Sequence, residues 1–235
     1  MSMARALHVF YGGTFDPVHN GHLAIACAAR DALGVGIAFL PAADPPHRPA
    51  PGASAVDRVA MLQLAIAGLP DLRLDLREIE HHTHDSSRRS WSIDTLRALR
   101  IELGADASIT WLLGADSFID LPHWKCWREL FALTHFVVAE RPGCVLDESL
   151  PPELAQMLQG RWVDAADALL RAPKGSVLRL HQPLQTHSAT DLRQRIGAGL
   201  PWRHLLPAAV ADYIVSNHLY GSSLYASAHP AESGT

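Results

Sequence analysis

Short apolar segments alternate with amphipathic segments along most of this 235-residue chain. The apolar segments have the length of buried strands, and the amphipathic segments repeat their apolar residues at helical spacing. Strands are predicted at residues 6–11, 36–40, 72–76, 109–113, 136–139 and 177–180. Helices are predicted at 23–33, 54–69, 92–103, 124–133, from 188 onward and at 206–214, with Ser92 as the expected cap of the third. Because strands that alternate with helices are joined by right-handed crossovers, we expect an α/β fold: a Rossmann-like parallel sheet with helices on both faces.

The remaining segments lack a regular pattern. Strict alternation in 72–76 predicts an edge strand with one solvated face. Residues 41–53 hold five prolines and predict a loop, residues 80–85 predict a solvated loop, and 147–175 predict a short helix plus loop. With no repeat and no long linker, we expect a single domain over residues 1–222 and a disordered tail over 223–235.

Composition excludes several classes of protein. Hydrophobic residues make up 48% and charged residues 19%, which is typical of globular proteins. A net charge of −4 is not that of a general nucleic-acid binder, and no apolar run predicts a membrane span. The three cysteines (Cys27, Cys126 and Cys144) are widely spaced, so we expect reduced thiols and a cytoplasmic location.

The segment from Gly12 to His22 lies between the first predicted strand and the first predicted helix. Gly12 and Gly13 permit positive φ and carry no side chain that would block the approach of a phosphate to the backbone. Free N–H groups at the helix start favour an anion, and His19 and His22 can donate to its oxygens. We therefore predict a nucleotide site for chemistry at a phosphate, formed by Gly12, Gly13, Thr14, Phe15, His19 and His22.

A second predicted helix start, Ser188 to Arg193, carries hydroxyl groups and a guanidinium near free N–H groups. Ser188, Thr190 and Arg193 are therefore predicted to bind the outer phosphates of a nucleoside triphosphate. Gly114 and Asp116 follow the strand at 109–113 and are expected at the same sheet edge. There, Asp116 could accept a hydrogen bond from a ribose hydroxyl or an adenine amino group.

Other residues extend the predicted site. Trp124 offers a flat face for stacking on an aromatic ring. His47, Arg48 and Arg141 are potential cations on loops beside the predicted cleft. The stretch from Glu80 to Asp85 contains three histidines, but its place between a strand and a loop does not favour a metal site, so none is predicted.

His19-Asn20-Gly21-His22 resembles the (H/T)-x-G-H signature of the nucleotidyltransferase superfamily. The order of motifs resembles that of bacterial nicotinate-nucleotide adenylyltransferases. The matching segments are 12–22, 45–48, 90–92, 94–96, 114–124, 141–143, 188–193 and 206–220. Where that family usually has Tyr-Thr this chain has Trp91-Ser92, and where it usually has Lys this chain has Arg48.

The resemblance implies transfer of AMP from ATP to nicotinate mononucleotide, with deamido-NAD and pyrophosphate as products, in NAD biosynthesis. The acceptor phosphate is already largely ionised at neutral pH, so alignment and charge stabilisation would suffice for catalysis. His19 and His22 are assigned to the α-phosphate and Arg193 to the β/γ end, and Mg²⁺ is expected to arrive with ATP. The acceptor is expected to meet His47, Arg48, Trp91, Ser92, Trp124 and Arg141.

Three alternatives stay open. The acceptor could be nicotinamide mononucleotide or phosphopantetheine, or the chain could be a nucleotide-binding regulatory protein without turnover. An NAD-dependent dehydrogenase would suit the α/β pattern, but the chain has no G-x-G-x-x-G turn. Neither a nucleic acid nor a membrane is expected as a partner, and the sequence leaves open whether the chain forms a homo-oligomer.

Overall fold

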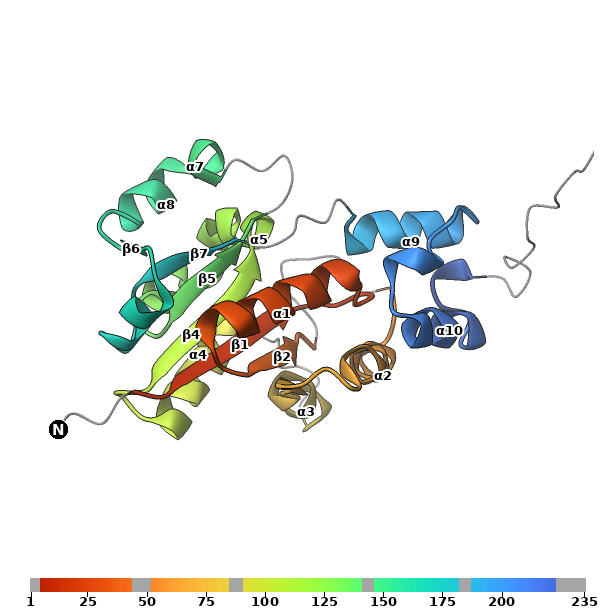
Figure 1. Cartoon of the computed structure of the whole chain (residues 1–235), viewed down its shortest axis with the longest axis horizontal. Coiled ribbons are helices and arrows are strands. Elements are labelled where there is room, and N and C mark those ends of the chain that lie inside the picture. The colour runs from red at the N-terminus through yellow and green to blue at the C-terminus, as the bar shows by residue number, and fades with distance from the viewer. Residues whose placement is uncertain (1–4, 44–51, 85–90, 141–145, 182–186, 223–235) are drawn as a thin grey trace, which may run out of the picture.

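A computed structural model of the chain describes residues 5–43, 52–84, 91–140, 146–181 and 187–222. Its centre is a parallel sheet with the strand order β3-β2-β1-β4-β5-β7-β6 (Figure 1). The strands are β1 (Leu7–Gly13), β2 (Ile37–Pro41), β3 (Leu72–Leu74), β4 (Ser108–Gly114), β5 (His135–Ala139), β6 (Trp162–Val163) and β7 (Val177–Leu180). The predicted parallel α/β sheet is confirmed, and β3 is an edge strand as its alternation predicted.

Helices cover both faces of the sheet. The longer ones are α1 (Asn20–Leu33), α2 (Ala55–Ile66), α3 (Arg77–His84), α4 (Ser92–Leu103), α9 (Ala189–Gly197) and α10 (Ala208–Ser216). The shorter ones are α5 (Ala115–Ile119), α6 (Trp127–Leu130), α7 (Leu146–Ser149) and α8 (Pro152–Met157). Four 3₁₀ turns complete the set: η1 (Leu121–His123), η2 (Ala166–Leu170), η3 (Arg203–Leu205) and η4 (Leu219–Gly221).

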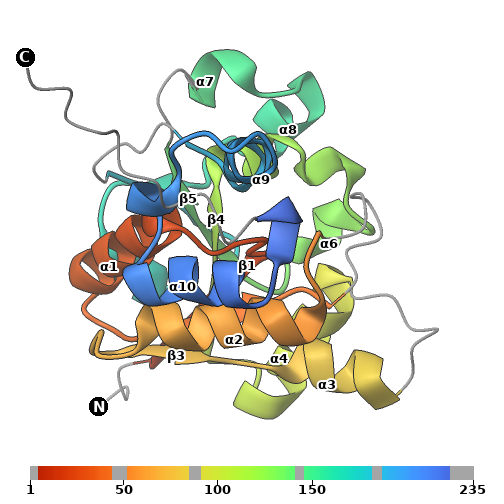
Figure 2. The same cartoon turned by 90° about the vertical axis from the view of Figure 1, so that its right-hand side faces the viewer.

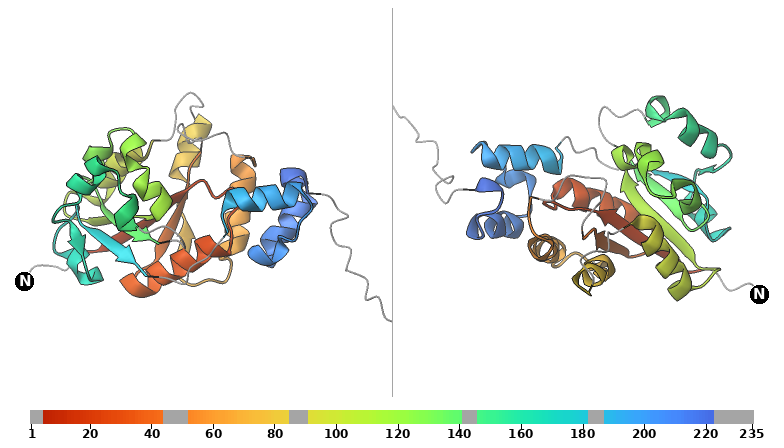
Figure 3. Two further views of the ribbon diagram at one scale, coloured as in Figure 1. Left: turned by 90° about the horizontal axis from the view of Figure 1, so that it is seen from above. Right: turned by 180° about the vertical axis from the view of Figure 1, so that it is seen from behind.

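Two hydrophobic cores lie on opposite faces of the sheet because successive strand residues point to opposite sides. Val9 and Tyr11 of β1 join one core with α1, α2, α9 and α10. Phe10, between them, joins the other core with α4, α5, α6 and α8. Figure 2 shows α1 on one side of the strands and α4 and α6 on the other. Figure 3 shows that α9 and α10, the last two helices of the chain, lie at one end of the molecule.

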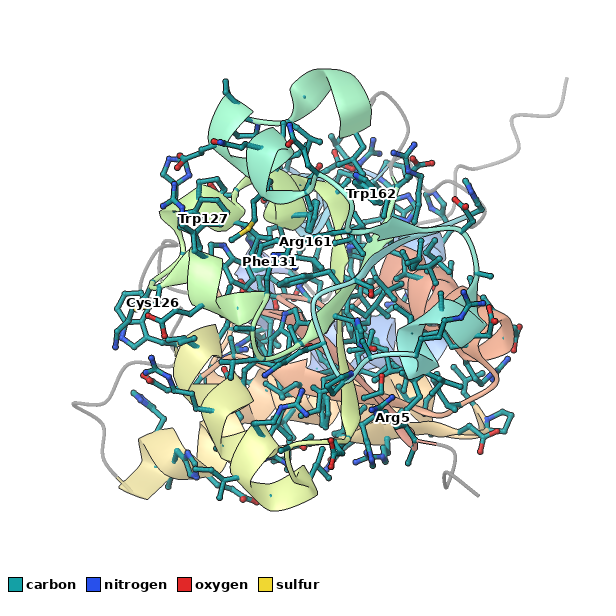
Figure 4. All side chains as sticks on the ribbon, turned by 90° about the vertical axis from the view of Figure 1, so that its left-hand side faces the viewer. Arg5, Cys126, Trp127, Phe131, Arg161 and Trp162 are labelled. Carbon is teal, nitrogen blue, oxygen red and sulfur yellow. The ribbon has the colours of Figure 1, made fainter. Side chains whose placement is uncertain are left out.

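The short edge strand β6 is held by arginine–aromatic packing. The guanidinium of Arg161 lies 5.5 Å from the ring centre of Phe131, and it donates to the carbonyls of Met157 and Gly175. Arg179 lies 5.1 Å from the ring centre of Trp162. In Figure 4, Arg161 and Phe131 lie between Trp127 and Trp162 at this side of the molecule. Such cation–π contacts bury arginine stems against the aromatic faces and hold a strand that has few ladder hydrogen bonds.

Four local predictions were wrong in part. Residues 80–84 are not a loop but the end of α3, whose start is fixed by Arg77 donating to Asp75 and Glu102. The helix predicted at 124–133 is only Trp127–Leu130, because Cys126 has a φ of 52°, which a continuous helix excludes. Trp91, not Ser92, occupies the cap position of α4. Residues 147–175 contain α8, β6 and η2 rather than one short helix.

Candidate active site at the carboxyl edge of the sheet

The two strands that carry the glycine motifs are neighbours. β1 pairs in parallel with β4, with Tyr11 opposite Leu112, so Gly13 and Gly114 end at the same sheet edge. In open parallel sheets, ligands bind beyond the carboxyl ends of the strands. The expectation that Gly114 lies at the same sheet edge as the first glycine motif is therefore confirmed.

Gly12 and Gly13 do not use the positive φ that glycine permits. Both belong to β1, where they pair with Leu40 and Pro41 of β2, so their backbone is extended. Glycine is needed for a different reason. A Cβ on Gly12 would lie 2.5 Å from Cζ2 of Trp111, and a Cβ on Gly13 would lie 2.9 Å from Cζ of Phe15. The positive φ lies at Phe15, at 52°.

His19 and His22 form a reciprocal cap at the start of α1. The Nδ1 atom of His19 accepts the N–H of Gly21 at 3.1 Å, and Nδ1 of His22 accepts the N–H of His19 at 3.3 Å. With both Nδ1 atoms accepting, the proton of each neutral ring lies on Nε2. The two rings stack with centres 3.7 Å apart, and His19 is buried while His22 is half-buried. His22 is therefore the better placed of the two to donate from Nε2 to a ligand.

The second motif lies directly beside the first. Ser188 caps α9 by accepting the N–H of Asp191 at 3.1 Å. From the next turn, Arg193 donates to the backbone oxygen of Asp16 at 2.6 Å, although 177 residues separate them. Its other terminal nitrogen, Nη2, lies 3.3 Å from Oγ1 of Thr190. The His187 ring is 5.6 Å from that of His19. The two predicted anion-binding motifs thus lie against each other.

Some of the remaining predicted site residues lie in the described part of the chain and others do not. Asp116 is exposed in the first turn of α5, next to the end of β4. Trp91 and Trp124 both pack against the core that contains α4 and α6, and Nζ of Lys125 lies 5.3 Å from the Trp91 ring centre. Ser92 begins α4 beside Trp91. The predictions for His47, Arg48 and Arg141 fall outside the described residues.

Comparison with known proteins identifies the family. Residues 10–195 match the cytidylyltransferase-like family model. The chain is 54% identical over 217 residues to a protein of Stenotrophomonas maltophilia named "Probable nicotinate-nucleotide adenylyltransferase", covering 92% of this chain and 98% of the relative. A relative of the same name from Xylella fastidiosa is 50% identical, covering 92% of this chain and 97% of the relative. The chain belongs to the nicotinate-nucleotide adenylyltransferase family.

The fold of this adenylyltransferase-family chain is also found in solved structures. Nicotinic acid mononucleotide adenylyltransferase of Plasmodium falciparum, in complex with NaAD, matches with a TM-score of 0.68. That match covers 94% of this chain and 100% of the other, at 17% identity. At that identity the likeness concerns the fold, which agrees with the sheet and its helices described above.

Sequence reasoning missed three residues that hold the predicted site segments together. Asp16 is 4% exposed and accepts from Gly52, Ala53 and Tyr220. Arg58 is fully buried and donates to the backbone oxygens of Thr14, Ala42 and Ala43. Arg58 could have been noticed because it falls on the same face of the predicted helix as Leu62 and Ala65. Tyr220 ends the last matching segment, 206–220, but nothing in that segment points to a contact with Asp16.

Burial and the Asp16 carboxylate raise the pKa of the Tyr220 hydroxyl far above its ordinary value of about 10. The Tyr220 hydroxyl therefore keeps its proton at neutral pH and donates it to Asp16. Of the three hydrogen bonds that the Asp16 carboxylate accepts, one therefore comes from Tyr220 in η4, the last 3₁₀ turn of the described chain.

Among the described residues, no group of three or more His, Cys, Asp or Glu side chains could hold a metal ion. The described residues include His81 and His82 of α3 but not residues 85–90. Within the same described ranges, no helix is both long and apolar enough to cross a bilayer.

Proposed function

We propose that this protein transfers AMP from ATP to nicotinate mononucleotide and releases pyrophosphate, forming deamido-NAD. The observation that carries the proposal is the hydrogen bond from Arg193 to the backbone oxygen of Asp16. It joins the motif of α9 to the histidine motif of α1, so one triphosphate can reach both. Membership of the nicotinate-nucleotide adenylyltransferase family supports the choice of reaction.

In the proposed reaction, a phosphate oxygen of nicotinate mononucleotide attacks the α-phosphorus of ATP. A new P–O bond forms there, and the bond between the α-phosphorus and the bridging oxygen to the β-phosphorus breaks. The electron pair leaves with pyrophosphate. The acceptor phosphate, with a second pKa near ~6, is already largely ionised, so the reaction needs no protein base.

The protein's part is alignment and charge stabilisation. His22, with its proton on Nε2, would donate to the α-phosphate, and buried His19 would hold His22 by stacking and capping. Arg193, with Ser188 and Thr190, would hold the β- and γ-phosphates. Since hard phosphate oxygens are preferred Mg²⁺ ligands, the ion is proposed to arrive as the magnesium complex of ATP.

The nucleotide and the acceptor would lie on either side of the β1–β4 junction. Gly12 to Phe15, Gly114 and Asp116 are proposed to line the ATP side. Trp91, Ser92 and Trp124 are proposed to meet the pyridine ring, and His47, Arg48 and Arg141 to meet the acceptor phosphate.

The test is an acceptor series. The purified protein is incubated with Mg-ATP and nicotinate mononucleotide, nicotinamide mononucleotide or phosphopantetheine, and pyrophosphate release is followed. We expect the highest kcat/KM with nicotinate mononucleotide. A higher value with one of the other acceptors would change the assigned substrate. ATP binding without pyrophosphate release from any acceptor would instead favour a regulatory protein.

A further inference from the structure

The Asp16 carboxylate is a buried junction between distant parts of the chain. Its Oδ1 accepts the Tyr220 hydroxyl at 2.7 Å and the Ala53 N–H at 3.1 Å, and its Oδ2 accepts the Gly52 N–H at 2.7 Å. Hydrogen bonds to an ionised carboxylate are stronger than those between neutral groups. Asp16 therefore ties the turn before α1 to the segment before α2 and to η4.

Arg193 meets the same residue but in a different way. Its Nη1 donates to the backbone oxygen of Asp16 at 2.6 Å, whereas the carboxylate Oδ2 is 3.6 Å away. The guanidinium thus keeps a partly exposed face, with 34% of its side chain accessible. A carboxylate that lost one of its donors would be free to draw the guanidinium into a closer ion pair.

Tyr220 is held in place by an unusual backbone. Tyr220 has a φ of 56° and His218 has a φ of 53°, both in the left-handed region that residues other than glycine rarely adopt. The Tyr220 ring lies against Gly52, where a Cβ would come within 3.1 Å of its Cε1 and 3.3 Å of Cδ of Arg193. Strained backbone of this kind persists where surrounding contacts require it, and it gathers at functional sites.

We infer that Tyr220 is a positioning residue for ATP binding: its hydroxyl occupies Asp16 Oδ1, so that Arg193 stays on the backbone oxygen and presents its other face to the β- and γ-phosphates. The inference rests on the phosphate role of Arg193 in the proposed function. It makes η4, which lies 204 residues from Asp16 in sequence, part of the triphosphate site.

The test compares two Tyr→Phe variants. Tyr220→Phe removes the hydroxyl that Asp16 accepts. Tyr213→Phe is the matched control, because it removes a Tyr–Asp hydrogen bond of 3.0 Å to Asp57, between α10 and α2, in which neither Asp16 nor Arg193 takes part. Calorimetry measures the binding of ATP and of AMP, which lacks the β- and γ-phosphates. We expect Tyr220→Phe to weaken ATP binding about tenfold, the size of one hydrogen bond to a charged group, and to leave AMP binding unchanged. Tyr213→Phe should bind both nucleotides as the wild type does.

A double-mutant cycle decides whether Tyr220 acts through Arg193. In an Arg193→Ala background, Tyr220→Phe should cause no further loss of ATP affinity. An equal loss in both backgrounds, or a parallel loss for AMP, would reveal a merely structural role and overturn the inference. If Arg193→Ala weakens ATP binding and Tyr220→Phe does not, only the inference fails. If Arg193→Ala binds ATP as tightly as the wild type, the proposed phosphate role of Arg193 fails.

Discussion

His22 has two separable tasks at the scale of the single residue. Its Nδ1 caps the backbone of α1, and its Nε2 carries the proton that the proposed function directs at the α-phosphate. An alanine substitution removes both at once. Asparagine places an oxygen near the position of Nδ1 and has nothing at the position of Nε2, so it separates the two tasks.

His22→Asn should keep wild-type stability and lower kcat by about 10²–10³-fold, the loss seen when one oxyanion donor is removed. His22→Ala should lose a similar factor in kcat and about 1 kcal/mol of the free energy of unfolding, because the cap is also lost. Pyrophosphate release and urea unfolding measure the two effects. Wild-type turnover in the asparagine variant would contradict the role of His22.

His135 offers a residue-scale test of pH dependence. Burial lowers the pKa of this ring, whose Nδ1 accepts the Ser176 N–H at 3.0 Å and whose Nε2 lies 3.0 Å from the Ala172 oxygen. Protonation would place a hydrogen on Nδ1, so that two donors, Nδ1–H and the Ser176 N–H, would face each other. The unfolded chain therefore binds more protons than the folded one below about pH 6.5, so this contribution to stability is present above that pH and is lost as the pH falls.

We expect the free energy of unfolding to fall between pH 7.5 and pH 5.5 by less in His135→Gln than in the wild type. Urea titrations at both pH values provide the measurement. His204→Gln, at an exposed position, is the control and should keep the wild-type difference between the two pH values. An unchanged difference in His135→Gln would show that His135 is not the group responsible.

At the scale of the element, the end of β1 is shaped by an aromatic ring on its neighbour. The indole of Trp111 of β4 occupies the space on the sheet face that a Cβ of Gly12 would need. The indole Nε1 is buried, and within the described residues nothing accepts a hydrogen bond from it. Replacing the indole by a smaller ring therefore loses no hydrogen bond.

Gly12→Ala should lower the free energy of unfolding by about 1–3 kcal/mol, the usual cost of overpacking a core. The double variant with Trp111→Phe should recover most of that loss, since phenylalanine lacks the atoms that a Cβ would meet. Gly197→Ala in α9 is the control, because its Cβ would have only an ordinary contact of 3.7 Å. Thermal unfolding of the three variants measures these changes in stability. A double variant no more stable than Gly12→Ala would rule out the indole as the cause.

At the scale of the whole molecule, the proposed triphosphate site joins the first βα turn to helices near the end of the described chain. Figures 1 and 2 show α9 and α10 beside α1 and α2 at one end of the sheet. A ligand that contacts both parts stabilises the folded chain by an amount set only by its affinity and concentration.

ATP at 100 times its Kd should raise the free energy of unfolding of the wild type by about 2.7 kcal/mol. The same ATP concentration should stabilise Arg193→Ala less, because its Kd is higher. Urea unfolding with and without ATP measures both. Equal stabilisation of the two proteins would argue against a contact between Arg193 and the triphosphate.

The disordered tail predicted for 223–235 stays a prediction, as does the single domain over 1–222. The last described side-chain contact is the buried hydrogen bond from Ser222 to the Ile214 oxygen. A chain ending at Ser222 should therefore unfold and bind ATP like the full chain, and one ending at His218 should bind ATP more weakly because it lacks Tyr220. Loss of stability in the chain that ends at Ser222 would mean that the tail packs on the domain.

Local patterns in the sequence were enough to predict most elements, the parallel sheet, the two anion motifs and the family. Each of these depends on neighbours within one strand or helix turn, such as the Ser54 cap of α2 and the Ser188 cap of α9. The exceptions have local causes as well: the left-handed backbone at Cys126 moves to Trp127 the start of a helix that the apolar pattern begins at residue 124.

Only the tertiary structure decided which side chains complete the site. Asp16 meets Arg193 and Tyr220 across 177 and 204 residues, and Gly12 is glycine because Trp111 of another strand lies on it. Side-chain periodicity records which face of an element is buried but not which partner covers it. Those partners are chosen when the sheet and helices pack together, because hydrogen bonds and ring contacts depend on distance in space rather than on separation along the chain.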